Sequence, residues 1–275
     1  MAKRVAASAG VPTPRFAVVE HLDDARGLDL AYPLIAKPLF EGSSKGIKDN
    51  SLVRTAAELY ERVDEILSVY KQPVIVERFL GGREFTVGVL GNYPHHEILP
   101  IVEIDHAQLP AGAAPIYSYE AKWIWDTPAN PLEIFRCPAE VNAELKRKLE
   151  GLITRTCAVL RIKDWCRIDV RLDEKGEPNI LEVNPLPGIL PNPEDNSCLP
   201  KAARTAGYGY SDLIHRVVEE AAKRYGLRTT RVRRRATDSS ASAWSWEKLA
   251  WRTSKSRATR LSRKTSRINP AGPLR

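Results

Sequence analysis

The residues of this chain that could do chemistry are concentrated in residues 164–188, which read DWCRIDVRLDEKGEPNILEVNPLPG. Two runs that alternate between apolar and polar residues flank a polar turn at Gly176, and this pattern predicts a β-hairpin. Because side chains alternate along a strand, the register decides which of them face each other. A tip at residues 174–177 pairs Leu172 with Asn179, Asp169 with Glu182, and Arg167 with Asn184.

One face of this hairpin is predicted to be core and the other to be charged. The core face would carry Ile168, Val170, Leu181 and Val183, and the charged face Arg167, Asp169, Glu182 and Asn184. Like charges opposite each other destabilise a sheet unless a cation lies between them. Two carboxylates and an amide oxygen are the ligands that Mg²⁺ takes together with substrate phosphates. The alternative is a solvated face with one salt bridge from Arg167. The metal interpretation requires a phosphate-binding site elsewhere in the sequence, because Mg²⁺ is usually bound together with substrate phosphates.

A candidate phosphate site is the glycine- and serine-rich stretch EGSSKGI, residues 41–47, which follows a strand that ends near Lys37. Glycines let the backbone curl so that successive N–H groups point at one anion, and serine hydroxyls add donors. The stretch matches neither the Walker A pattern nor G-x-G-x-x-G, so neither of those nucleotide folds is indicated. An ordinary loop between strand and helix is the alternative. The lysine before it and the oxygen cluster after it favour the phosphate interpretation.

The elements that must position these residues follow from hydrophobic periodicity. We expect strands within 11–20, 32–38, 72–80, 83–92 and 97–104, helices over 55–70 and 139–160, the hairpin, and a helical region over 201–225. This order predicts an α+β fold with antiparallel strands, helices packed on one face, and two small lobes.

Composition limits the class of protein. The 275 residues contain no apolar stretch long enough to span a membrane, and the first residues lack the apolar run of a signal peptide, which indicates the cytoplasm. The cysteines have no CxxC spacing, so we expect buried free thiols and neither zinc ligands nor disulfides. They are Cys137, Cys157, Cys166 and Cys198.

The positive charge of the chain is confined to its C-terminal part. The whole chain has a net charge of +8, but residues 228–275 alone carry +12 and residues 1–227 carry −4. The C-terminal stretch is rich in Arg, Ser and Thr and has no period of a helix or strand, so we expect one domain over 1–227 and a disordered basic tail over 228–275. Binding of nucleic acid or acidic membrane by this tail is the alternative to an appendage without a role in the chemistry.

Four stretches, in this order, resemble the ATP-grasp domain of the D-alanine–D-alanine ligase family: IAKPLFEGSSKGI, VERFLGGREFTVGVLGN, YEAKW and RIDVRLDEKGEPNILEVNPLPG. The similarity runs from about residue 10 to residue 226. It implies an ATP-grasp fold with ATP between two α+β lobes, and a role in peptidoglycan biosynthesis. In that family a first carboxylate is phosphorylated to an acyl phosphate, and the amine of a second substrate displaces the phosphate.

The resemblance implies a nucleotide site. Glu77 would accept a hydrogen bond from the adenine amino group, the backbone of Phe79 and Leu80 would pair with the ring edge, and Glu84 would bind the ribose hydroxyls. Without the resemblance, these two glutamates are equally consistent with surface charges. Lys37 and Lys122 would contact the phosphates under the loop. The full ATP-contacting set is Lys37, Glu41, Gly42, Ser44, Gly46, Glu77, Phe79, Leu80, Glu84 and Lys122.

The resemblance also implies the metal and substrate residues. The ligands of Mg²⁺, or of Mn²⁺ in its place, would be Asp169, Glu182 and Asn184, with Glu182 bridging two ions. Arg167 and the backbone N–H of Gly188 would stabilise the oxyanion formed on amine attack. Ser43 would face the substrates, and Ser197 would hold the carboxylate of the second amino acid.

Two departures from the family pattern put the substrate in doubt. Trp123 stands where the ligases carry a tyrosine, and an indole can donate a hydrogen bond but cannot accept one. The spacing from Gly188 to Ser197 is longer than in the ligases. In addition, the chain begins inside the expected link to the ATP-grasp domain, so we expect the N-terminal domain to be missing, with its acidic residue for the first amino acid and a further ATP-contacting lysine.

The sequence therefore predicts an ATP- and magnesium-dependent ligase of small-molecule amino acids. One alternative is an ATP-grasp ligase for another acid or amine. A second is an ATP-binding module that is not catalytic alone, with a second copy of the chain or a partner chain supplying the missing domain. A nucleic-acid binder that acts through the basic tail is the third.

Overall fold

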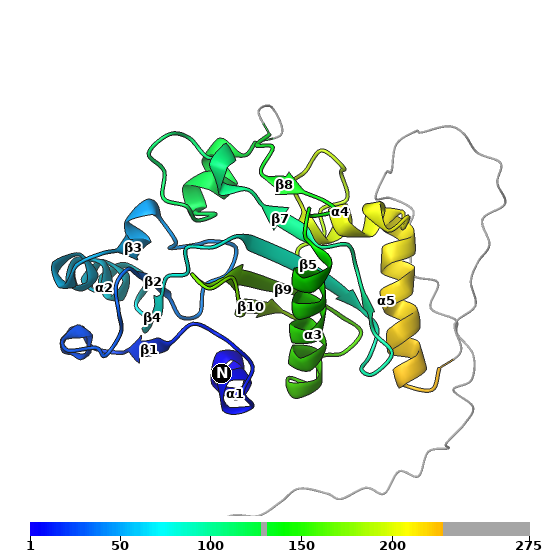
Figure 1. The fold of residues 1–275 in the computed structure, drawn as a ribbon, viewed down its shortest axis with the longest axis horizontal. Coiled ribbons are helices and arrows are strands. Elements are labelled where there is room, and N and C mark those ends of the chain that lie inside the picture. The colour runs from blue at the N-terminus through cyan, green and yellow to red at the C-terminus, as the bar shows by residue number, and fades with distance from the viewer. Residues whose placement is uncertain (128–130, 228–275) are drawn as a thin grey trace, which may run out of the picture. The chain divides into compact units, whose positions relative to one another are not determined.

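The computed structural model describes residues 1–127 and 131–227. The predicted tail and its boundary at residue 228 lie outside these residues. Within them the chain forms two antiparallel β-sheets, each with helices packed against it (Figure 1). This arrangement confirms the predicted α+β class.

The smaller sheet has the strand order β1-β4-β2-β3. Its strands are β1 (Phe16–Val19), β4 (Val74–Arg78), β2 (Leu34–Pro38) and β3 (Leu52–Val53). Helix α2 (Ala56–Tyr70) packs on it through an apolar stripe that includes Leu59, Val63 and Ile66. The helix begins where the Thr55 side chain accepts from the Glu58 N–H, and it ends at Lys71 with φ +53°. The opposite face of this sheet lines a cleft between the two sheets.

The larger sheet has the order β10-β9-β5-β7-β8, with β6 paired to β5. Its strands are β5 (Glu84–Leu90), β6 (Glu97–Ile98), β7 (Val102–Ile104), β8 (Phe135–Arg136), β9 (Trp165–Leu172) and β10 (Pro178–Asn184). One face belongs to the core under helix α3 (Ala143–Val159), through Phe85, Val87, Ile168 and Val170. The alternate residues face the cleft: Glu84, Thr86, Arg167, Asp169 and Arg171.

Helices α4 (Cys198–Thr205) and α5 (Tyr210–Arg224) pack beside β5 (Figure 1). A Cβ atom on Gly88 would lie 2.4 Å from Leu199 Cδ1, so the glycine allows α4 to approach the strand closely. Two glycines, Gly207 with φ +89° and Gly209 before α5, separate the helices. The predicted helical region over 201–225 is therefore two helices.

The N-terminal segment joins the two sheets. Helix α1 (Ala2–Ser8) packs against α3, and the residues after it hydrogen-bond to the larger sheet before the chain enters β1. Pro12 accepts from the Ile180 N–H at 2.9 Å, and the Thr13 hydroxyl donates to the Ile180 carbonyl at 2.8 Å. The periodicity of the sequence did not indicate α1, because the helix has only seven residues.

Most expected elements are present, and the differences have local causes. The expected strand over 97–104 is divided at Pro100, which has no N–H to donate to a ladder. Short elements were not expected: they are the 3₁₀-helices Leu22–Ala25, Asp49–Ser51 and His106–Gln108, the π-helix Ala121–Trp125, and strands β3 and β8.

Candidate active site

A cleft of about 510 Å³ lies between the two sheets. The sequence proposed eighteen site residues, and all of them except Glu41 and Gly46 line this cleft. Glu41 instead accepts a hydrogen bond from Gln72 at 3.0 Å, and the carbonyl of Gly46 accepts from Arg62. These two residues therefore hold the base of the loop.

Two lysines meet one buried glutamate on the wall formed by the smaller sheet. Lys37 Nζ lies 3.1 Å from Glu77 Oε2, and Lys3 of α1 contacts Glu77 Oε1. Burial alone would raise the pKa of Glu77, but Lys37 and Lys3 lower it below its usual value. Burial lowers the pKa of Lys3 to about 8, although Glu77 opposes the shift. For Lys37, burial also lowers the pKa, but Glu77 and Glu182 outweigh it and leave the pKa raised.

Lys3 was not among the residues proposed from the sequence, which instead expected a further nucleotide-contacting lysine to be missing. The structure places Lys3 beside Glu77 as a second lysine. Its position could not be found from periodicity, because it depends on how α1 docks 74 residues away from Glu77 in sequence.

On the larger sheet, the carboxylate of Glu84 is held by two side chains that the sequence also did not propose. Arg171 Nη1 donates to Glu84 Oε2 at 2.9 Å, and His106 Nε2 lies 3.0 Å from the same oxygen. The Arg171 guanidinium lies 4.6 Å from the ring centre of Phe79. The alternation of β9 could have indicated Arg171, because it lies on the same face as Arg167 and Asp169.

The glycine-rich loop has an unusual backbone and is held from the facing segment. Ser43 and Ser44 have φ of +54° and +60°, a region that residues other than glycine rarely adopt. The Ser44 hydroxyl donates to the Tyr117 carbonyl at 3.0 Å, and Trp123 Nε1 donates to the Ser43 carbonyl at 3.1 Å. Strain of this kind persists only when surrounding contacts enforce it, and it is concentrated at functional sites. Trp123 therefore binds the backbone of the loop, and not the serine side chain that the tyrosine of the ligases would bind.

The hairpin brings the predicted cluster of oxygen ligands together. Its register at the tip differs from the predicted one. Asp169 pairs with Glu182 and Arg167 with Asn184, as predicted, but Leu172 pairs with Pro178 because the ladder shifts between Ile180 and Glu182. The expected pairing of Leu172 with Asn179 is thus wrong. A bulge places two consecutive residues on similar sides, so Ile180 enters the core while Leu181, predicted to be core, lines the cleft.

The carboxylate of Asp169 accepts four hydrogen bonds. Arg167 donates to both of its oxygens at 3.0 and 2.9 Å, the Thr86 hydroxyl to Oδ1 at 2.6 Å, and Asn184 Nδ2 to Oδ2 at 3.1 Å. Burial raises the pKa of Glu182, and the facing Asp169 raises it further, so the nearby cations do not balance the charge at Glu182.

This donor set fits a hard divalent cation. A cation would relieve the repulsion between Glu182 and Asp169, and the amide oxygen of Asn184 is the remaining ligand of the right kind. Within residues 1–127 and 131–227, no three His, Cys, Asp or Glu side chains are arranged to hold a metal, so the third protein ligand would have to be this amide.

The far end of the cleft holds Gly188, Ser197 and Lys122. The Ser197 hydroxyl donates to the Gly188 carbonyl at 3.3 Å and accepts from the Leu190 N–H at 3.3 Å. These two hydrogen bonds hold together the ends of the segment from Gly188 to Ser197, which is longer than in the ligases. Burial, and next the proximity of Arg167, lower the pKa of Lys122. Cys198 also lines the cleft here, and burial raises the pKa of its thiol to about 12. All four cysteines are free thiols; Cys157 and Cys166 are buried as predicted, whereas Cys137 and Cys198 are only partly buried.

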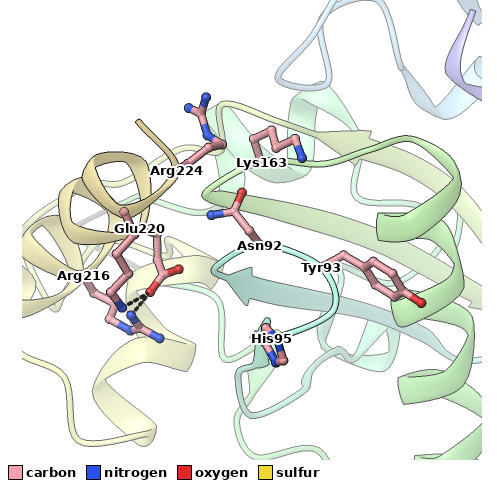
Figure 2. Close-up of a pocket in the computed structure, with 8 residues that line it drawn as sticks. Asn92, Tyr93, His95, Lys163, Arg216, Glu220 and Arg224 are labelled. Atoms are coloured by element: carbon pink, nitrogen blue, oxygen red, sulfur yellow. Dashed lines mark hydrogen bonds and ion pairs between the residues drawn. The ribbon is translucent and has the colours of Figure 1, made fainter. Parts of the chain in front are cut away.

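A second hollow is formed by the turn after β5, the loop before β9 and helix α5 (Figure 2). Several basic side chains border it, but Arg216 and Lys223 bind Glu220, and Arg224 binds Asp164. The glycine-rich loop and the carboxylate cluster border the cleft instead. We therefore place the functional site in the cleft.

Two antiparallel α+β lobes with a glycine-rich loop and a carboxylate cluster across one cleft define the ATP-grasp class of proteins. The chain belongs to the D-ala D-ala ligase C-terminus family, whose model matches residues 5–219. This confirms the family that the sequence motifs resemble.

Individual relatives agree with the family. The chain is 34% identical to the uncharacterised protein y4sG of Sinorhizobium fredii over 82% of this chain and 62% of that protein. It is 34% identical to a D-alanine–D-alanine ligase of Pseudomonas putida over 79% of this chain and 62% of the ligase. A Bacillus anthracis D-alanine–D-alanine ligase complexed with ATP has the same fold, with a TM-score of 0.62, 22% identity, and coverage of 82% of this chain and 65% of that one.

The chain thus spans about 62% of the length of the curated relatives that it matches. Among the helices of residues 1–127 and 131–227, none combines the length and the apolar character that crossing a membrane requires.

Proposed function

We propose that this chain binds Mg-ATP in the cleft and uses it to join the carboxylate of one amino acid to the amine of another. The observation that carries the proposal is the pairing of Lys37 and Lys3 with Glu77 on one wall, opposite Asp169, Glu182 and Arg167 on the other. The family assignment supports it, since relatives are named D-alanine–D-alanine ligase.

The nucleoside would lie at the end of the cleft that holds Glu77, Phe79 and Glu84. Glu77 would accept from the adenine amino group, the backbone of Phe79 and Leu80 would pair with the ring edge, and Glu84 would accept from the ribose hydroxyls. The nucleotide would then replace the lysines as a partner of Glu77. Released from that glutamate, Lys37 would turn to the phosphates, where a cation is attracted more strongly than by one carboxylate.

The phosphates would lie under the loop that contains Gly42, Ser43 and Ser44. Its N–H groups and hydroxyls provide donors, and Lys122 adds a cation from the facing segment. Asp169, Glu182 and Asn184 would hold Mg²⁺ or Mn²⁺, which supplies charge neutralisation and alignment of the phosphates when bound. Arg167 donates to both oxygens of Asp169 and so orients its carboxylate for this role.

In the proposed reaction an oxygen of the first carboxylate attacks the terminal phosphorus of ATP, and ADP leaves. The neutral amine of the second substrate then attacks the acyl carbon and forms the C–N bond of a tetrahedral oxyanion. This oxyanion collapses to the amide as the C–O bond to phosphate breaks, and inorganic phosphate leaves with the proton that the amine loses. Arg167 and the Gly188 N–H would donate to the oxyanion of the second step. Each preorganised donor of this kind is worth about a hundredfold or more in rate.

Ser197 and Trp123 bear on which amino acids the chain would join. Ser197 would bind the carboxylate of the second substrate, for which its hydroxyl must leave the Gly188 carbonyl. The Trp123 indole donates to the loop backbone, so it offers the substrate an apolar face. D-alanine is the first substrate to test, because the relatives carry it in their names.

The test is a calorimetric titration with Mg-ATP, followed by assays of phosphate release with D-alanine and a panel of other amino acids. Release that depends on D-alanine supports a D-alanine ligase, and release with another acid or amine supports a different ATP-grasp ligase. ATP binding without release supports a module that needs a partner, which we propose to be a second copy or a chain that resembles the rest of the relatives. Absence of ATP binding contradicts all three.

We propose the cytoplasm as the compartment, which the four free cysteines support.

A further inference from the structure

The carboxylate of Glu84 uses its two oxygens unequally. Both of its side-chain partners, Arg171 Nη1 at 2.9 Å and His106 Nε2 at 3.0 Å, contact Oε2. Among the described residues no hydrogen bond is made to Oε1, although Glu84 is 9% exposed and lines the cleft. The side chain is therefore fixed from one side and available to a ligand on the other.

Arg171 is placed to fix this orientation because it is itself immobilised. It is only 4% exposed, its Nε donates to the Gly82 carbonyl at 3.1 Å, and its Nη2 donates to the Pro115 carbonyl at 2.9 Å. Its guanidinium also lies 4.6 Å from the ring centre of Phe79, at a distance where a cation is attracted to a π face. One side chain thus holds both the aromatic ring and the carboxylate at this end of the cleft.

His106 fixes the carboxylate from the segment after β7. Its Nε2 binds Glu84, while its Nδ1 is buried without a hydrogen-bond partner in the described part of the chain. A buried polar atom without a partner is costly, and such an exception needs a reason. An ion pair with Arg171 would be enough to stabilise the fold around Glu84. His106, as a second donor to the same oxygen, restricts the rotation of the Glu84 carboxylate.

We propose that Arg171 and His106 are positioning residues that direct Glu84 Oε1 at the ribose and so set a preference for nucleotides that carry both ribose hydroxyls. This inference rests on the proposed function, in which the nucleoside lies beside Glu84. Glu84 with one oxygen fixed can accept from both hydroxyls in one geometry. If its carboxylate rotates, the hydroxyl contacts become interchangeable with water and the preference is lost.

The experiment compares the dissociation constants of Mg-ATP and Mg-2′-deoxy-ATP by calorimetry. The unchanged chain should prefer ATP by about tenfold, the lower end of what a hydrogen bond to a charged group provides. His106→Ala and Arg171→Met should each reduce this preference to within about threefold. His106→Gln, which keeps an N–H donor, should restore part of it.

Arg83→Met is the matched control. Arg83 is next to Glu84, forms a two-bond ion pair with Glu103 at 2.6 and 2.8 Å, and lies 5.1 Å from the ring centre of Phe85, but it does not line the cleft. This variant should keep the full preference. Melting temperatures of all variants show whether Arg171→Met is folded, and His106→Ala provides the answer if it is not.

The outcomes separate the two proposals. If the unchanged chain binds ATP with no preference over the deoxynucleotide, or if His106→Ala weakens both nucleotides equally, the positioning role is wrong while the ATP site stands. If the unchanged chain binds neither nucleotide, the proposed function fails and the positioning role fails with it.

Discussion

We expect Lys3 to make the proposed nucleotide binding dependent on pH in a way that can be measured. Its ammonium group is buried against Glu77, with 14% of its side chain exposed, and burial lowers its pKa from 10.5 to about 8. A bound polyphosphate would place several negative charges near this group and move its pKa back toward 10.5, because a nearby opposite charge favours the charged form. Binding should therefore be coupled to uptake of a proton.

The size of the effect follows from the two pKa values. Lys3 should take up roughly 0.1 proton at pH 7, 0.5 at pH 8 and 0.9 at pH 9 when ATP binds. The affinity for ATP should correspondingly fall about fivefold between pH 8 and pH 9, because Lys3 of the nucleotide-free protein is mostly deprotonated at pH 9. The terminal phosphate of ATP is ionised throughout this range, so it does not contribute.

The assay is calorimetric titration of Mg-ATP at pH 7, 8 and 9 in two buffers with different ionisation enthalpies, whose difference in heat gives the number of protons. Lys3→Met should bind ATP more weakly and take up about 0.5 proton fewer at pH 8 and about 0.9 fewer at pH 9 than the unchanged chain. Lys146→Met, which changes an exposed lysine of α3, should behave like the unchanged chain. Uptake that is constant from pH 7 to 9, or that is the same in Lys3→Met as in the unchanged chain, would refute the assignment of Lys3 to the nucleotide.

Three further changes test the loop and the metal site. Glu182→Gln should abolish the magnesium dependence of ATP binding and leave the melting temperature equal or slightly higher, because one of two facing carboxylates is removed; unchanged Mg-ATP affinity would exclude it as a ligand. Gly46→Ala should destabilise the fold by about 1–3 kcal/mol in chemical denaturation, since φ is +71° and the new Cβ would lie 2.5 Å from a proline ring. Gly42→Ala, with open space around its Cβ, is its control, and equal losses would contradict the cause given. Trp123→Phe removes the hydrogen bond to the Ser43 carbonyl, so we expect about a fivefold loss in ATP affinity by titration; no loss would show that this bond does not hold the loop.

The part of the fold that could be predicted from the sequence is the part with strong periodicity. Helices α2 and α3 have clear apolar stripes, and β9 and β10 alternate cleanly, so their facing residues Asp169 and Glu182 were paired correctly. The roles of the site residues in binding and catalysis remain predictions.

The features that could not be predicted depend on backbone irregularity or on distant contacts. The bulge that turns Leu181 into the cleft leaves the surrounding apolar pattern unchanged, because Ile180 fills the core position instead. His106 reaches Glu84 from a one-turn 3₁₀-helix, which has no period to detect. In each case the tertiary contact, and not local propensity, decides where the side chain points.

The joining of the two sheets by the first residues of the chain has a consequence for folding. Thr13 bonds to Ile180, 167 residues away in sequence, and Lys3 reaches Glu77. Contacts of such high sequence separation form late, because the chain must close a long loop before they stabilise it. During synthesis Thr13 leaves the ribosome long before Ile180, its partner on β10, which emerges only after most of the domain. We therefore expect a nascent chain to remain unable to bind nucleotide until β10 has been made, which makes ATP affinity a direct measure of completed folding.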